Sequence, residues 1–87
     1  MTQKAETAVI TGAGDGIGRA LAVNLNARGV NLYLCDISPE RLAETKQMLD
    51  TDKGSVTTTV VDCGNREAIE AWAESIAREV TTIEFLF

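Results

Sequence analysis

The residues best suited to chemistry in this chain are four alternating glycines near the N-terminus, namely Gly12, Gly14, Gly16 and Gly18. They follow a short apolar stretch and lead directly into a helical pattern. A turn without side chains lets backbone N–H groups approach a phosphate closely. The helix start adds unpaired N–H groups and the positive end of the helix dipole at the same place. This stretch therefore predicts a phosphate or pyrophosphate site.

The glycine spacing is compatible with some ligand patterns and excludes others. The phosphate-loop pattern G-x-x-x-x-G-K-[ST] fails because no lysine stands at the required place, and G-x-G-x-x-G fails from both Gly12 and Gly14. The G-x-G-x-G pattern of methyltransferases that bind S-adenosylmethionine matches Gly12, Gly14 and Gly16. The pattern T-G-x-x-x-G-I-G matches in full from Thr11 to Gly18.

Two acidic residues, Asp36 and Asp62, follow the next two expected strands. Asp36 stands close to the spacing of about 20 residues after the glycines that is expected of an acid binding a ribose. Its carboxylate would accept hydrogen bonds from two ribose hydroxyls. The alternative is a solvated loop acid or a helix-start residue. Asp62 has two interpretations of equal weight: it binds a ligand at the end of its strand, or it caps a helix that begins near Asn65.

Strands and helices are expected to alternate throughout the chain. The expected strands span residues 7–11, 30–35, 56–61 and 83–87, and the expected helices span 17–28, 38–50 and 64–80. This order predicts an α/β fold with parallel strands joined by right-handed crossovers, which is half of a doubly wound sheet. Ligands bind such sheets at the carboxyl ends of the strands, where the glycines and both acids are expected.

Each helix has an apolar stripe that is expected to face the sheet. The inward positions are expected to be Ile17, Ala20, Leu21 and Leu25 in the first helix, Leu42, Thr45 and Leu49 in the second, and Ile69, Trp72, Ala73, Ile76 and Val80 in the third. The charged residues of the third helix are expected to form a solvated face.

Composition excludes several classes of function. The net charge is −5 and the basic residues are scattered, so no nucleic-acid partner is expected. No apolar run approaches the ~20 residues of a membrane span, and the polar N-terminus lacks a signal peptide, which favours a cytoplasmic protein without a membrane partner. There is no histidine, the commonest general base and metal ligand. Cys35 and Cys63 suggest a redox pair, but buried thiols acting as small apolar residues are the favoured interpretation.

The T-G-x-x-x-G-I-G stretch resembles the short-chain dehydrogenase/reductase family. The resemblance extends to Asp36 and Asp62 at the strand ends. It also extends to Ile83–Phe87, which looks like the family's fourth strand and ends where its N-N-A-G motif would begin. The resemblance implies a partial Rossmann-like sheet with the order β-α-β-α-β-α-β, in which residues 1–87 are the N-terminal NAD-binding half of a longer domain. It also implies hydride transfer on an alcohol or carbonyl.

The resemblance further implies a dinucleotide cofactor, with NAD preferred over NADP. Asp36 would repel a 2′-phosphate, and Asp15 and Ile37 stand where NADP-preferring members often carry basic residues. Asp62 would bond the adenine amino group, with Cys63 beside the ring. The expected cofactor-binding residues are Gly12, Gly14, Asp15, Gly16, Ile17, Gly18, Asp36, Ile37, Asp62 and Cys63.

The catalytic residues that the resemblance implies are a Tyr-x-x-x-Lys pair, a Ser and an Asn. The single tyrosine is Tyr33, and four residues later stands Ile37, so no catalytic residue is assigned to this chain. The alternatives are a non-catalytic nucleotide-binding module and a methyltransferase fragment. A longer parent protein is expected to be a homo-oligomer, and the 87-residue chain to self-associate through residues 83–87.

Overall fold

The structure, a computed structural model, describes residues 6–80 and 82–87. Strands and helices alternate in the order β1 (Thr7–Thr11), α1 (Gly16–Ala27), β2 (Asn31–Asp36), α2 (Pro39–Gln47), β3 (Val56–Val60), α3 (Arg66–Glu79) and β4 (Phe85–Leu86). The strands form one parallel sheet in the order β3-β2-β1-β4. The expected doubly wound arrangement is confirmed.

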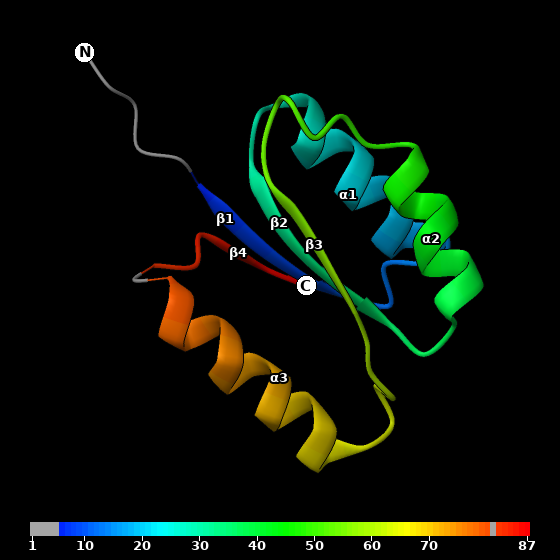
Figure 1. Ribbon diagram of the computed structural model, residues 1–87, viewed down its shortest axis with the longest axis vertical. Helices are drawn as coiled ribbons and strands as arrows, with labels where there is room; N and C mark the ends of the chain where they lie inside the picture. The colour runs from blue at the N-terminus through cyan, green and yellow to red at the C-terminus, as the bar shows by residue number, and fades with distance from the viewer. Residues whose placement is uncertain (1–5, 81) are drawn as a thin grey trace.

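Helices cover both faces of the sheet, with α1 and α2 on one face and α3 on the other (Figure 1). Because side chains alternate along a strand, Leu32 and Leu34 of β2 face α1 and α2, whereas Tyr33 and Cys35 face α3. The core beneath α1 and α2 consists of Ala8, Ile10, Ala13, Ala22, Leu25, Val30, Leu32, Leu34 and Leu42. The core beneath α3 consists of Val9, Cys35, Val61, Trp72 and Ile76.

Each helix begins at a side chain that satisfies an unpaired backbone N–H group. Asp15 caps α1, Ser38 caps α2 with Pro39 at its first position, and Asn65 caps α3 by accepting from the N–H of Ala68 at 3.2 Å. A good N-cap contributes about 1 kcal/mol. Gly29 follows α1 with a φ of 81°, in the left-handed conformation that commonly ends a helix.

The end of α2 differs from the expectation. The helix ends at Gln47, not near Asp50. Asn26 explains the difference, because its side-chain oxygen accepts from the Asp50 N–H at 2.8 Å while its amide donates to the Asp50 carbonyl at 3.0 Å. These two bonds draw the chain toward α1 and off the α2 axis.

The fourth strand is also shorter than residues 83–87. Only Phe85–Leu86 qualify as strand, although the pairing continues at both ends. The Glu84 N–H donates to the carbonyl of Thr7 at 2.9 Å, and the Phe87 N–H donates to that of Val9 at 2.9 Å.

The buried stripe of α1 is rotated relative to the expectation. Ile17 was expected to face the sheet, but it is 81% exposed, and Ala20 is exposed as well. Gly18 explains this, since a Cβ at Gly18 would run into the carbonyl oxygen of Gly12. This close approach turns Gly18 inward and its neighbour Ile17 outward, so that Ala22, Leu25 and Asn26 are buried.

The inward faces of the other helices match the expectation more closely. Leu42 and Thr45 of α2 are buried, as are Trp72 and Ile76 of α3. The exception is Ala73, which is exposed because the α3 stripe is narrower than predicted.

Candidate functional site

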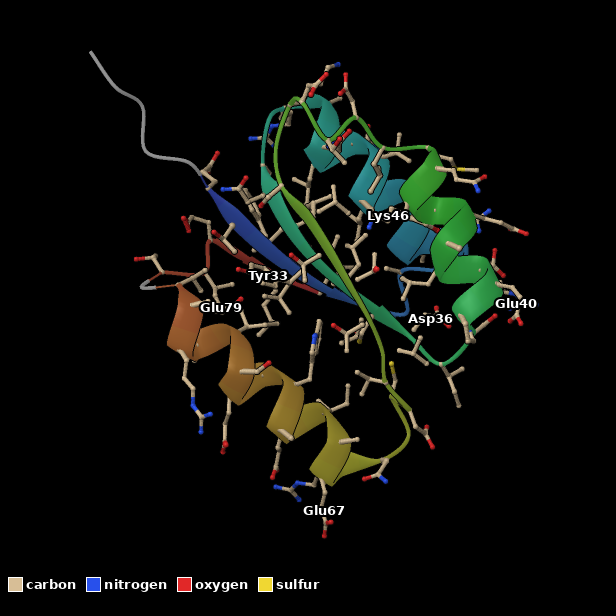
Figure 2. The ribbon with its side chains drawn as sticks, viewed as in Figure 1. Tyr33, Asp36, Glu40, Lys46, Glu67 and Glu79 are labelled. Carbon is tan, nitrogen blue, oxygen red and sulfur yellow. The ribbon has the colours of Figure 1, made fainter. Side chains whose placement is uncertain are left out.

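The carboxyl ends of β1, β2 and β3 meet at one edge of the sheet. In the parallel register Thr11 lies opposite Cys35, and Asp36 lies opposite Val60. The glycine loop, Asp36 and Asp62 therefore share this edge, as expected. Figure 2 shows Asp36 at the end of β2, close to the first turn of α2. This is the edge at which parallel α/β sheets bind ligands.

The glycine loop, residues 12–16, owes its shape to backbone conformations that other residues rarely adopt. Gly12 has a φ of 63° and Gly16 a φ of 54°, both in the left-handed region. The loop is tied to β2 because the Ala13 N–H donates to the Cys35 carbonyl at 2.9 Å. The loop after β1 is therefore held against the end of β2.

The Asp36 carboxylate is hydrogen-bonded to the glycine loop and to the start of α2. Its Oδ2 accepts from the Gly14 N–H at 2.8 Å and its Oδ1 accepts from the Ser38 N–H at 3.0 Å. The residue is only 9% exposed, so it is not the solvated acid of the alternative interpretation. A carboxylate offers about four acceptor positions, so about two remain for a ligand.

Asp15 is the residue of the glycine loop that precedes the first residue of α1. Its Oδ1 accepts from the Gly16 N–H at 2.8 Å, and its Oδ2 pairs with Nη1 of Arg41 at 3.5 Å. Both side chains are largely exposed, so the ion pair contributes under about 1 kcal/mol. It nevertheless places a positive charge beside the loop that the sequence did not predict.

Residues of the β3–α3 loop lie at the far side of the same edge. Asp62 accepts from the Gly64 N–H at 2.9 Å and shapes the turn. It does not cap α3, because Asn65 does. Ile37 is 61% exposed at the end of β2.

The two cysteines differ in their surroundings. Their Sγ atoms lie 3.8 Å apart, but Cys35 is buried and Cys63 is exposed, so the buried interpretation is correct for Cys35 and wrong for Cys63. Burial, and then the neighbouring Cys63 thiol, raises the pKa of Cys35 to about 12. Cys35 is therefore protonated at neutral pH.

Tyr33 lies in the middle of β2, away from the candidate edge. Figure 2 shows it on the α3 side, near Glu79. Burial, and then the Glu79 carboxylate, raises its pKa above the usual value, which makes the phenol a weaker acid that is harder to deprotonate. Among the side chains that the structure describes, no group of three or more His, Cys, Asp or Glu residues could hold a metal ion.

Three residues at the loop were not predicted as site residues. Arg19, Arg41 and Thr45 all contact residues 13–15. Arg19 follows the glycine pattern immediately, and the other two come from α2. The only sequence signal was the position of Thr45 on the inward face of α2. The edge thus combines backbone donors for a phosphate with a carboxylate for hydroxyl groups.

Comparison with known proteins agrees with this geometry. The model of the short chain dehydrogenase family matches residues 6–87. This chain belongs to the short-chain dehydrogenase family. The putative oxidoreductase SadH of Mycobacterium tuberculosis is 37% identical over 82 residues, which cover 94% of this chain and 30% of SadH.

Solved short-chain dehydrogenases share the fold. A family member from Burkholderia phymatum in complex with NAD superposes with a TM-score of 0.84 at 32% identity, covering 97% of this chain and 30% of that one. A metagenomic short-chain oxidoreductase in complex with NADP gives a TM-score of 0.83 at 27% identity, covering 93% and 37%. The chain thus spans about a third of the length of these relatives.

Within residues 6–80 and 82–87, none of the helices has the length and the apolar character that a membrane span requires.

Proposed function

We propose that this chain forms the cofactor-binding part of an NAD(H)-dependent oxidoreductase that acts on an alcohol or carbonyl group. The observation that carries the proposal is the 2.8 Å bond between Asp36 and the N–H of Gly14, because it unites the glycine loop and the acid in one site. NAD supplies a hydride acceptor when bound, and NADH a hydride donor. This chain's own residues bind and orient the adenosine and pyrophosphate groups.

The pyrophosphate would lie at the start of α1. The first N–H groups of a helix have no intrahelical partners and carry partial positive charge. Gly12 and Gly16 present no Cβ there, and nothing lies within 4 Å of the place where a Cβ would stand. Arg41 offsets the negative charge of Asp15 beside this position.

The adenosine ribose would lie on Asp36. Its free acceptor positions suit the 2′ and 3′ hydroxyls, and each charge-assisted bond contributes about 1.5–3 kcal/mol. A 2′-phosphate would face the same buried carboxylate, which supports a preference for NAD(H) over NADP(H). The positive charge of Arg41 is partly offset by its ion pair with Asp15, so the Asp36 carboxylate is the group proposed to decide the preference.

The adenine would lie between the ends of β2 and β3. Ile37 offers an exposed apolar surface, and Asp62 is exposed near Cys63. One oxygen of Asp62 shapes its own turn, and the other would accept from the adenine amino group.

Calorimetric titration with NADH and NADPH tests the proposal. We expect the chain to bind NADH more tightly, and Asp36→Asn to weaken NADH binding about tenfold while narrowing the difference from NADPH. Glu67→Gln removes the same charge from the exposed start of α3 and should change neither affinity. Tighter binding of NADPH by the unaltered chain overturns the preference, and no binding of either overturns the proposal.

The same titration also tests the two alternative functions, a methyltransferase fragment and a non-catalytic nucleotide-binding module. S-adenosylmethionine should not bind, and the family match does not support a methyltransferase. A non-catalytic module would bind NADH equally well but would show no turnover in any protein that contains this chain. The presence of a Tyr-x-x-x-Lys pair after Phe87 in the gene, together with activity of its product, separates that module from the proposed oxidoreductase.

A further inference from the structure

Arg19 and Thr45 join α1 and α2 to the carbonyl side of the glycine loop. We infer that both are positioning residues, which hold the loop in the conformation that a pyrophosphate requires. The inference rests on the proposed function and deepens it. It concerns the side of the loop that faces away from the ligand.

Thr45 contributes a completely buried hydroxyl from α2. Its Oγ1 donates to the carbonyl of Ala13 at 2.8 Å and accepts from Nε of Arg19 at 2.9 Å. A threonine hydroxyl in a helix often bonds to a carbonyl one turn earlier in the same helix. This one crosses to the glycine loop instead, so α2 and the loop are directly linked.

Arg19 completes the link from the first turns of α1. Its Nη2 donates to the Gly14 carbonyl at 2.6 Å, to the Arg41 carbonyl at 3.1 Å and to Glu44 Oε2 at 3.2 Å. Its side chain is only 22% exposed. The planar guanidinium has donors in a fixed fork, which lysine cannot reproduce.

These contacts determine the orientation of two consecutive peptide groups. The peptide between Ala13 and Gly14 is held at its carbonyl by Thr45 and at its N–H by Asp36. The next peptide is held at its Gly14 carbonyl by Arg19. Because C=O and N–H point in opposite directions across a trans peptide, the Asp15 N–H is directed away from Arg19.

A glycine-rich loop needs such support. Glycine has more backbone freedom than any other residue, and ordering it opposes binding entropically. A loop that is already ordered avoids that loss when the ligand binds. Loss of the Arg19 and Thr45 contacts should therefore weaken recognition of the pyrophosphate, and leave recognition of the nucleoside largely unchanged.

Parallel NMR titrations of the whole chain with ADP and with adenosine test this inference, because only ADP carries the pyrophosphate. We expect Thr45→Val, which removes the hydroxyl with little change of shape, to weaken ADP binding about tenfold. Adenosine binding should change less than about twofold. Thr45→Ser, which retains a hydroxyl, should restore ADP binding to within about threefold of the unaltered chain.

Arg19 is tested in the same way. Arg19→Gln should weaken ADP binding selectively, and Arg19→Lys should recover little of it, because the fork is lost. Arg66→Gln is the matched control, since Arg66 is 90% exposed on α3 and pairs only with Glu70 among the described residues. The control should bind both ligands normally.

The outcomes separate the two proposals. If the unaltered chain binds neither ligand, the proposed function fails and the inference fails with it. If the unaltered chain binds ADP but the Thr45 and Arg19 variants bind it equally well, or lose adenosine to the same degree, only the inference is overturned. Circular dichroism identifies any variant that does not fold, in which case Arg19→Lys decides the test: a selective loss of ADP binding supports the inference, and unchanged ADP binding overturns it.

Discussion

Oδ2 of Asp36 lies 2.8 Å from the backbone nitrogen of Gly14, so the acid at the end of β2 and the loop after β1 form one hydrogen-bonded unit. The bond is buried, where loss of one partner leaves the other unsatisfied at a cost of about 1–3 kcal/mol or more. The residue proposed to select the cofactor therefore also maintains the loop that is proposed to bind the phosphates.

Gly14→Ala should disrupt this unit. A Cβ at Gly14 would lie 2.8 Å from Asp36 Oδ2 and 2.9 Å from the Cβ of Arg41, so the loop or Asp36 must shift. We expect the free energy of unfolding to fall by about 1–3 kcal/mol in urea titrations, and NADH binding to be lost. Gly64→Ala is the control for the urea titration alone, because its Cβ would meet only the Asp62 carboxylate, at 3.2 Å, and the midpoint should change little. An unchanged midpoint for Gly14→Ala would contradict the close packing.

The two cysteines should differ in reactivity. With its pKa raised to about 12, Cys35 is almost entirely protonated at pH 8, and it is also buried. Iodoacetamide should therefore add once to the folded protein, at Cys63, and twice in denaturant, as measured by mass spectrometry. Rapid modification of Cys35 in the folded state would show that the site opens readily.

Alkaline pH should destabilise the protein through Cys35. The thiol has a pKa near its ordinary value of 9.0 when unfolded and about 12 when folded, so the folded state retains its proton more strongly. The unfolded state therefore gains relative stability as the pH rises above about 9. Urea midpoints between pH 8 and 10.5 should fall less in Cys35→Ser, and equal declines in both proteins would assign the effect to other groups.

Trp72 should anchor α3 to the sheet. It is 7% exposed and packs with Val9, Cys35, Val61 and Ile76. We expect Trp72→Ala to lower the free energy of unfolding by about 3–5 kcal/mol, and Trp72→Phe to lower it less because the ring retains most contacts. This cluster lies on the face of the sheet that α3 covers, and not on the face covered by α1 and α2. If Trp72→Ala lowers the free energy of unfolding by less than about 1 kcal/mol, α3 packs loosely against the sheet.

The 87-residue polypeptide, studied alone, should self-associate through β4. Leu86 is 73% exposed and Phe87 46% exposed, and among the described strands β4 pairs only with β1. Exposed apolar edges favour intermolecular pairing. Leu86→Lys should lower the average mass in sedimentation equilibrium, whereas Met48→Lys, at an exposed site outside the sheet, should not. A monomeric unaltered chain would contradict this prediction.

The sequence by itself determined the order of elements, the parallel α/β fold class and the position of the glycine loop. Those features follow from local patterns: apolar runs in strands, caps such as Ser38 and Asn65, and glycines at fixed spacing. The family resemblance of Thr11–Gly18 rested on the same local spacing, and the comparison with known proteins confirms it.

The tertiary structure alone decided how the loop is held and which way α1 faces. Ile17 points outward because Gly18 must lie against Gly12, a contact between the two ends of a turn. Arg19 and Thr45 meet across 26 residues of sequence, and only the packing of α1 beside α2 brings them to the same two peptides. Periodicity identifies the buried face of a single helix, but contacts between elements depend on the distances and rotations at which those elements pack.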